Sequence, residues 1–141
     1  MGGNYPDIKG LPFPGQLYHR IDNAKVEDQV KFLVLTLEQI IHLMDAREDM
    51  NAVQWNLKTV DHFLADLYRQ ASELKECVAQ YHPSHKESYE RKIVRHFRNL
   101  KKFLKKKEYS AQAWEQIRRV VKQHLQRMDI IASNATSFKK V

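Results

Sequence analysis

The sequence has little proline and glycine, one cysteine and no long uncharged apolar run. Of its 4 Gly and 4 Pro, only Pro83 lies after residue 15. The rest of the chain therefore has almost no helix breakers, which favours long helices and an all-α domain. No run of about 18 uncharged apolar residues is present, so we expect no membrane insertion.

Patterns that indicate catalysis or metal binding are also missing. The chain has no glycine-rich phosphate loop, and Asp61-His62 lies in no strand-turn-helix setting that would hold a nucleophile. A zinc site needs four converging ligands, whereas Cys77, His82 and His85 supply at most three. We therefore expect no catalytic residue, no metal site and no cofactor.

What the chain does have is basic charge gathered in one segment. Its net charge is +7, and residues 86–107 hold ten Lys or Arg against two acidic residues. Such a segment attracts nucleic acid, heparin-like glycans or an acidic receptor surface, unless it is simply a solvated helix face. Its aromatic residues Tyr89, Phe97 and Phe103 fall on the apolar stripe, where they are poorly placed to stack on bases. We therefore expect no nucleic-acid partner.

A chain of 141 residues with 43% hydrophobic residues suits one domain with a real core. Apolar residues recur at three- and four-residue steps over four segments, as in amphipathic helices. The first of these segments is apolar around most of its surface, which predicts a central, buried helix. Residues 1–22 combine prolines and glycines with scattered apolar residues, so we expect a long loop that packs on the core. We expect helices over residues 24–46, 51–81, 86–107 and 110–133, and a tail over 134–141.

Polar residues mark the expected starts of three helices. Ser110 can accept a hydrogen bond from the first turn of the last helix. Asn51 with Gln54, and Ser84 with Glu87, have the spacing of capping boxes. These two pairs would start the second and third helices.

Three blocks of sequence occur in a distinctive order. The first comprises Phe13-Pro14, Leu17-Tyr18 and residues 21–33. The second comprises Trp55, Phe63, Leu67-Tyr68, Gln70, Leu74 and Cys77-Val78. The third is the run FLKKKEYSAQAWE over residues 103–115. Together they resemble the type I interferons, most closely those of bony fishes in the two-cysteine group, and the resemblance covers nearly the whole chain.

The resemblance implies a single helical cytokine domain over residues 1–141. The family fold is an up-up-down-down helical bundle in which a long overhand loop joins helices A and B. Residues 4–22 would be this loop, and the four expected helices would be helices B, C, D and the last helix, while helix A is absent from this chain. The chain would then be a fragment of a longer one. If it instead starts at Met1, we expect the open groove to be filled by a dimer partner or an exchanged helix.

Cysteine usage fits the two-cysteine group. Cys77 matches the family cysteine that bonds the mature N-terminus, so the resemblance implies a disulfide whose partner is absent from this chain. Gln112 occupies the position of a cysteine in four-cysteine members, so the second family disulfide cannot form. As the only cysteine, Cys77 also fits a free thiol in the reducing cytosol.

The resemblance implies a secreted, extracellular antiviral cytokine rather than an enzyme. Such a protein bridges two class II cytokine receptor chains, which triggers JAK-STAT signalling and induces antiviral genes. A leaderless cytosolic form is the alternative location. The competing hypothesis is an intracellular helical adaptor that binds acidic partners or glycans through the basic residues 86–107.

The resemblance also implies two receptor-binding surfaces. The tighter receptor chain would contact Leu11, Phe13, Gln16, Arg118, Arg119, Lys122, Gln123 and Gln126. The second receptor chain would contact His42 and Tyr68. Trp55 and Trp114 stand in the first turns of two helices and are interpreted as packing residues. Asn134 begins an Asn-Ala-Thr sequon and is a glycosylation candidate.

Overall fold

The structure, a computed structural model, describes residues 8–79 and 88–139. These residues form α-helices, one 3₁₀ helix (η1) and no strand beyond an isolated bridge between Ile8 and Leu11. The prediction of an all-α chain is therefore confirmed. The elements in chain order are α1 (Gly15–Asp22), α2 (Val26–Met44), η1 (Arg47–Asp49), α3 (Leu57–Val78), α4 (Ser88–Lys106) and α5 (Ala111–Lys139).

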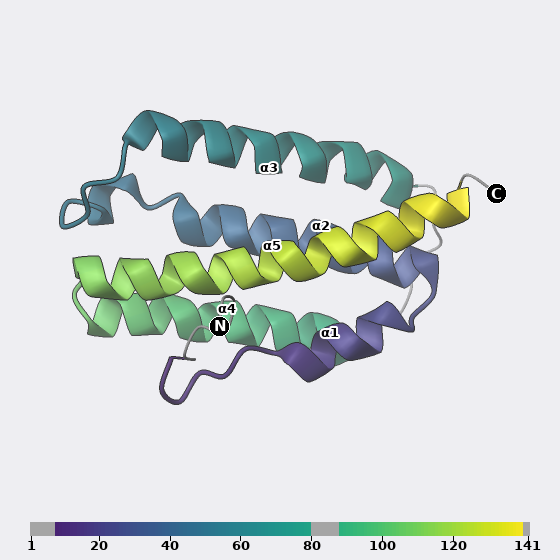
Figure 1. Ribbon diagram of the computed structural model, residues 1–141, viewed down its shortest axis with the longest axis horizontal. Helices are drawn as coiled ribbons and strands as arrows, with labels where there is room; N and C mark the ends of the chain where they lie inside the picture. The colour runs from purple at the N-terminus through teal and green to yellow at the C-terminus, as the bar shows by residue number, and fades with distance from the viewer. Residues whose placement is uncertain (1–7, 80–87, 140–141) are drawn as a thin grey trace, which may run out of the picture.

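Helix α2 lies at the centre of the bundle and packs against α1, α3, α4 and α5. Figure 1 shows α2 and α4 running in one direction and α3 and α5 running in the other. Helix α3 packs mainly on α2, whereas α5 also contacts α1 and α4. The central position of α2 follows from its sequence, because Phe32, Leu37 and Ile40 are buried on different sides of the helix.

The first helix was not expected. The sequence predicted a loop over residues 4–22, but Gly15–Asp22 form α1. The last helix breakers of this region are Pro14, at the N-cap position, and Gly15 itself. After them Leu17, Tyr18 and Ile21 recur at helical spacing, and all three are buried. The loop prediction is therefore wrong for residues 15–22.

Helix α3 begins at Leu57 rather than at residue 51. Its N-cap is Asn56, whose side chain accepts a hydrogen bond from the Lys58 amide at 2.9 Å. The side chain of Asn51 is used elsewhere, because its Nδ2 donates to the carbonyl of Glu48 in η1. The capping box predicted at residues 51–54 is therefore wrong, and the helix ends at Val78 instead of residue 81.

The turn between α4 and α5 agrees with the sequence prediction. Ser110 Oγ accepts a hydrogen bond from the Ala113 amide at 3.2 Å, which confirms Ser110 as the cap of α5. Glu108 and Tyr109 have φ angles of 54° and 55°, a left-handed conformation that reverses the chain without glycine. The predicted start of the preceding helix at residue 86, with its Ser84 and Glu87 cap, lies outside the described residues.

Three helices differ further from prediction at their ends. Helix α2 spans Val26–Met44 rather than 24–46, because Lys25 is extended and Asp45 leaves the helical conformation. Helix α4 ends at Lys106, one position before the predicted end. Helix α5 continues to Lys139, so the tail predicted over 134–141 is helical through residue 139. No glycine or proline follows residue 127 to stop it.

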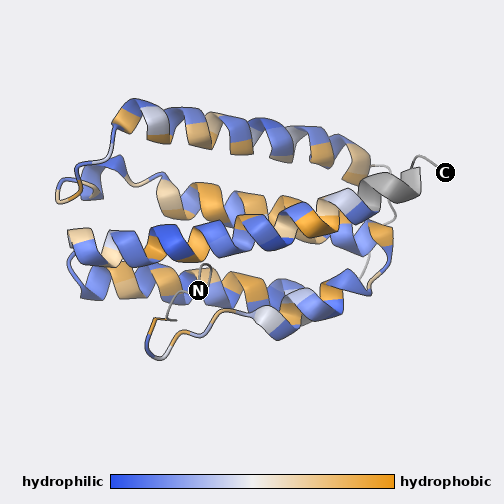
Figure 2. Ribbon diagram, viewed as in Figure 1, coloured by the Kyte–Doolittle hydropathy of each residue, from blue (hydrophilic) through white to orange (hydrophobic). Residues whose placement is uncertain are grey.

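The core is formed by the apolar sides of the helices, which face one another in Figure 2 while the outer sides are hydrophilic. Trp114 is fully buried, and its Nε1 donates to the Asp49 carbonyl at 2.9 Å. Its ring meets that of the partly buried Trp55 edge to face, with ring centroids 5.9 Å apart. The packing interpretation is thus confirmed for Trp114. None of the helices in the described part of the chain is long and apolar enough to cross a membrane.

Candidate functional site

The exposed face of α5 carries the largest group of predicted receptor-binding residues. Arg118, Lys122 and Gln126 are exposed and lie at four-residue steps, so they share one side of the helix. Arg119 and Gln123 lie beside them and are half-buried. The structure therefore brings these five residues together on one helix face.

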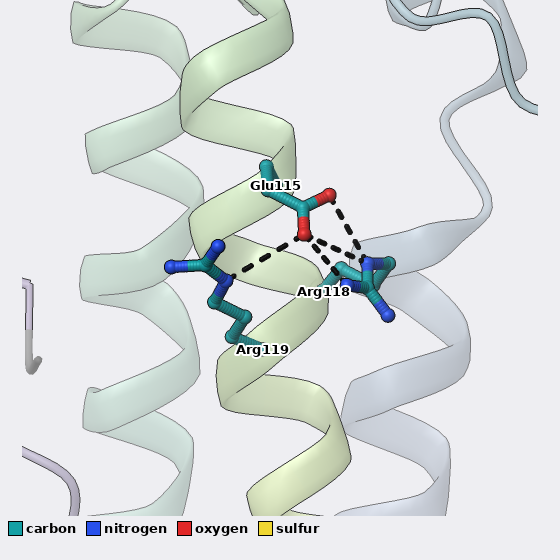
Figure 3. A network of polar contacts seen from close by, with 3 residues as sticks. All are labelled: Glu115, Arg118 and Arg119. Atoms are coloured by element: carbon teal, nitrogen blue, oxygen red, sulfur yellow. Dashed lines mark hydrogen bonds and ion pairs between the residues drawn. The ribbon is translucent and has the colours of Figure 1, made fainter. Parts of the chain in front are cut away.

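The two arginines of this face are held by Glu115, and we call Glu115, Arg118 and Arg119 the glutamate–arginine cluster (Figure 3). Arg118 donates to Glu115 from Nε and from Nη2, the latter at 2.6 Å. Arg119 reaches the same carboxylate from the other side, with its Nε 3.5 Å from Oε1. These contacts, the Arg118 hydrogen bonds foremost, lower the pKa of Glu115. The cluster fixes the direction of two guanidinium groups on side chains that stay 50% (Arg118) and 40% (Arg119) exposed.

The predicted residues before α1 differ in exposure. Only Gln16 is exposed, whereas Leu11 and Phe13 are partly buried against the core. The Phe13 ring stacks on Tyr18 with centroids 5.5 Å apart and meets His124 at 4.7 Å. Phe13 is therefore a packing residue that ties residues 8–14 to α1 and α5, and Gln16 is the accessible member of this set.

The residues predicted to contact the tighter receptor chain fall into two groups, one around the start of α1 and one on α5, and members of each group line a different hollow. Leu11, Phe13 and Gln16 line a cavity of about 560 Å³ together with Arg95 and other residues of α4. Arg118 and Lys122 line an apolar groove of about 460 Å³ between α5 and α3, with Trp55, Val60 and Phe63. The structure brings members of each group together but does not unite the two groups in either hollow.

The residues predicted for the second receptor chain do lie together. His42 of α2 and Tyr68 of α3 line one small cavity of about 110 Å³. Tyr68 is 67% exposed, which is unusual for a large aromatic residue. Beside it, Lys75 Nζ lies 2.7 Å from the Glu38 carboxylate, an ion pair that joins α3 to α2. Hydrogen bonding to Glu38 raises the pKa of Lys75.

A buried polar chain, which we call the histidine cluster, joins Tyr18 of α1, His96 of α4 and His124 of α5. The Tyr18 hydroxyl lies 2.6 Å from His124 Nδ1, and His124 Nε2 lies 2.9 Å from His96 Nε2. Tyr18 and His124 are fully buried, and His96 is 9% exposed. No role was predicted for His96 or His124. The sequence feature that could have predicted their burial is position, because both histidines fall on the apolar stripes of their helices.

Burial keeps the histidine cluster uncharged. It lowers the pKa of His96 to about 4, and burial together with the neighbouring His96 lowers the pKa of His124 well below its ordinary value. Burial also raises the pKa of Tyr18 above its ordinary value. Arg127 lies over the Tyr18 ring at 5.5 Å and pairs with Asp22 at 2.7 Å. This arrangement fastens α1 to α5 and is suited to structure rather than to proton transfer with solvent.

The remaining predictions concern Cys77, Asn134 and metal binding. Cys77 is a partly buried cysteine near the end of α3. Asn134 is exposed on α5, inside the helix rather than in a tail. No group of three or more metal-binding side chains occurs among the described residues, and His82 and His85 lie outside them.

Comparison with known proteins gives consistent matches. The interferon alpha/beta domain family matches residues 5–135. Interferon a3 of Oncorhynchus mykiss is 47% identical over 135 residues, which cover 94% of this chain and 73% of that protein. Interferon alpha-1 of Equus caballus is 31% identical over 88 residues, which cover 59% of this chain and 47% of that protein.

The solved structure of zebrafish interferon 1 is 70% identical to this chain and superposes with a TM-score of 0.88. The match covers 96% of this chain and 86% of that chain. The fold is therefore the helical cytokine fold, and members of this family are cytokines rather than enzymes. The chain belongs to the interferon alpha/beta family and is a type I interferon of the fish kind.

Proposed function

We propose that this interferon is a secreted antiviral cytokine that acts by holding two class II cytokine receptor chains together at the cell surface. The bound pair triggers JAK-STAT signalling and induces antiviral genes. The family assignment supports an antiviral cytokine. The observation that favours bridging is the presence of two separate candidate surfaces on different helices, the exposed face of α5 and the His42–Tyr68 cavity between α2 and α3.

The α5 face is suited to bind the tighter receptor chain. A guanidinium held by a neighbouring carboxylate is already oriented, so less side-chain entropy is lost when a partner binds it. Arg118 is held in this way by Glu115 and is half-exposed. Lys122 and Gln126 extend the same face by further hydrogen-bonding groups. We keep Gln16 as a further contact for this receptor chain, beside α4 rather than in the groove between α5 and α3, and treat Leu11 and Phe13 as packing residues.

The second receptor chain would contact Tyr68 and His42. An exposed tyrosine beside a small cavity offers a flat apolar ring and a hydroxyl, a combination enriched in binding hot spots. Once the first receptor chain is bound, both partners share one membrane. The high effective concentration there allows a weaker second contact to complete the complex.

The adaptor hypothesis places the same protein inside the cell and assigns binding to α4. The family assignment favours the cytokine. Addition of the purified protein to the medium of fish cells distinguishes the two hypotheses, because only a receptor ligand induces antiviral transcripts from outside.

The decisive test is the double variant Arg118→Glu with Arg119→Glu, compared with Lys25→Glu and Lys58→Glu as a matched control. All four residues are basic, and both control residues are exposed on other helices or turns. We expect the first variant to lose antiviral transcript induction by at least about tenfold, since truncating a buried arginine contact typically costs roughly 2 kcal/mol. The control should keep it.

Circular dichroism and thermal unfolding of both variants establish that they fold. A folded Arg118→Glu, Arg119→Glu variant with full activity would contradict the proposal that the tighter receptor chain binds the exposed face of α5. Because Arg119 is less exposed than Arg118, the pair Arg118→Glu with Lys122→Glu repeats the test with two exposed side chains. Tyr68→Ala with His42→Ala should bind the first receptor chain normally and fail to signal.

A further inference from the structure

The outer side of α4 carries a straight row of cations. Arg91, Arg95, Arg98 and Lys102 follow one another at four- and three-residue steps, so they lie on one side of the helix, and all four are exposed. Lys105 and Lys106 continue the row to the end of the helix. At about 1.5 Å per residue the row is roughly 20 Å long. We call these six residues the basic stripe.

Within the described part of the chain, the stripe is not neutralised by ion pairs. Among the described residues, ion pairs use basic residues that lie outside α4, and no carboxylate pairs with a member of the stripe. Helix α4 contains eight Lys or Arg and one acidic residue, Glu90, which gives it a formal charge of +7. This equals the net charge of the whole protein. The stripe therefore attracts anions over its full length.

Hollows border the stripe on both sides. One, of about 560 Å³, lies between α4 and the segment before α1 and is lined by Lys92 and Arg95. The other, of about 450 Å³, is lined by Leu35 of α2, by Arg91, Arg95 and Arg98, and by one acidic residue, Glu90. Arg95 lines both hollows, so bulky anionic groups can sit on either side of the row and still contact it.

We propose that α4 binds a linear sulfated glycosaminoglycan of the heparin class along the basic stripe. Such a polymer presents sulfate and carboxylate groups at regular intervals along a flexible chain, which matches a straight row of cations flanked by hollows. A secreted cytokine meets these polysaccharides on cell surfaces and in the extracellular matrix. Binding there would concentrate the interferon near its receptors.

Two other polyanions fit the stripe less well. Single-stranded nucleic acid binds through aromatic stacking as well as charge, and Tyr89 and Phe97 of α4 are buried. A membrane surface is bound by helices that insert apolar side chains, and the exposed large apolar residues of the described chain, Leu57, Tyr68 and Ile130, lie on α3 and α5. These polyanions are therefore controls in the test.

The test measures binding of the purified full chain to heparin as a function of salt. We compare the wild type with Arg98→Gln, Lys102→Gln and with the matched control Lys25→Gln, Lys58→Gln. Both variants lose two exposed positive charges. The stripe variant should bind roughly tenfold more weakly at moderate salt, and the slope of log affinity against log salt should fall by roughly two. The control should differ little from the wild type.

Equal weakening by the two variants would show attraction by net charge alone and would overturn the proposal. Undiminished binding to heparin stripped of sulfate would also overturn it. Binding to single-stranded DNA, or to vesicles of anionic phospholipid, that survives as much salt as heparin binding would assign the stripe to that polyanion and overturn the proposal. No receptor is present in these measurements, so their outcome does not depend on the receptor-bridging function.

Discussion

Two polar clusters lie on α5, and they differ in almost every physical respect. The histidine cluster is buried, neutral and linked to α1 and α4. The glutamate–arginine cluster is half-exposed, charged and contained within α5. A buried polar group costs free energy unless it is hydrogen-bonded, whereas exposed ion pairs contribute little to stability. We therefore expect the first cluster to determine how the helices assemble and the second to determine what the surface binds.

The substitution with the largest expected effect on stability is His124→Ala, which tests whether the histidine cluster determines how the helices assemble. The change empties a fully buried position and leaves Tyr18 and His96 without their shared partner. We expect the free energy of unfolding to fall by about 4 kcal/mol, from the lost packing and the unsatisfied polar groups. Urea denaturation measures this, and His62→Ala, at an exposed position, serves as control. A loss below about 1 kcal/mol would show that the cluster is not structural.

Acidification tests the same contrast without a mutation. The ordinary pKa of histidine is 6.5, and in the folded protein the pKa of His96 is about 4. A lowered folded-state pKa means that the unfolded chain takes up the proton first, so stability is lost as the pH falls from about 6.5 toward 4. His124 acts in the same direction. We expect a total loss of roughly 3 kcal/mol or more over this range.

Thermal unfolding between pH 7 and pH 4 measures this loss. His96→Gln keeps a hydrogen-bonding side chain at that position but removes its titration, so its stability should depend less on pH. Arg127 lies over the Tyr18 ring, and Lys92 and Arg95 line a hollow with His96, so these basic side chains add to the cost of a buried imidazolium. Unfolding curves that do not change with pH would contradict a buried neutral histidine pair.

The smallest effect should come from the exposed cluster. Glu115→Gln removes the carboxylate that holds Arg118 and Arg119, and we expect a stability loss of about 0.5 kcal/mol or less because solvent screens these groups. The loss should shrink further at high salt. Glu73→Gln, at an exposed position of α3, is the matched control. An effect as large as that of His124→Ala would erase the contrast between the clusters.

Local pattern was sufficient for much of the fold. The scarcity of glycine and proline predicted an all-α chain, and Ser110 predicted the start of α5. The same local reasoning failed where residues that commonly break or cap a helix do not have that role in this structure. The prolines and glycines before residue 16 led to the prediction of a loop where α1 forms. The spacing of Asn51 and Gln54 predicted a helix start there, whereas the N-cap of α3 is Asn56.

The candidate site was predicted less evenly than the fold. Helical spacing was enough to place Arg118, Lys122 and Gln126 on one face, and family resemblance pointed to His42 and Tyr68, which the structure brings into one cavity. Neither indicated that Phe13 packs against Tyr18 and His124. A contact of this kind depends on how α1 lies against α5, and residue spacing within one segment does not predict that arrangement.

By itself the sequence determined the helical class, the family, the stripe of cations on α4 and the polar face of α5, because each follows from residue type and spacing within one segment. Only the tertiary structure decided that Tyr18 would meet His124, a residue 106 positions away, and that His96 would contact the other ring nitrogen of His124. It also placed the loop residues and Arg118 in different hollows. The physical reason is that burial and pairing between distant segments arise from how helices pack, and that packing is set by the whole core at once.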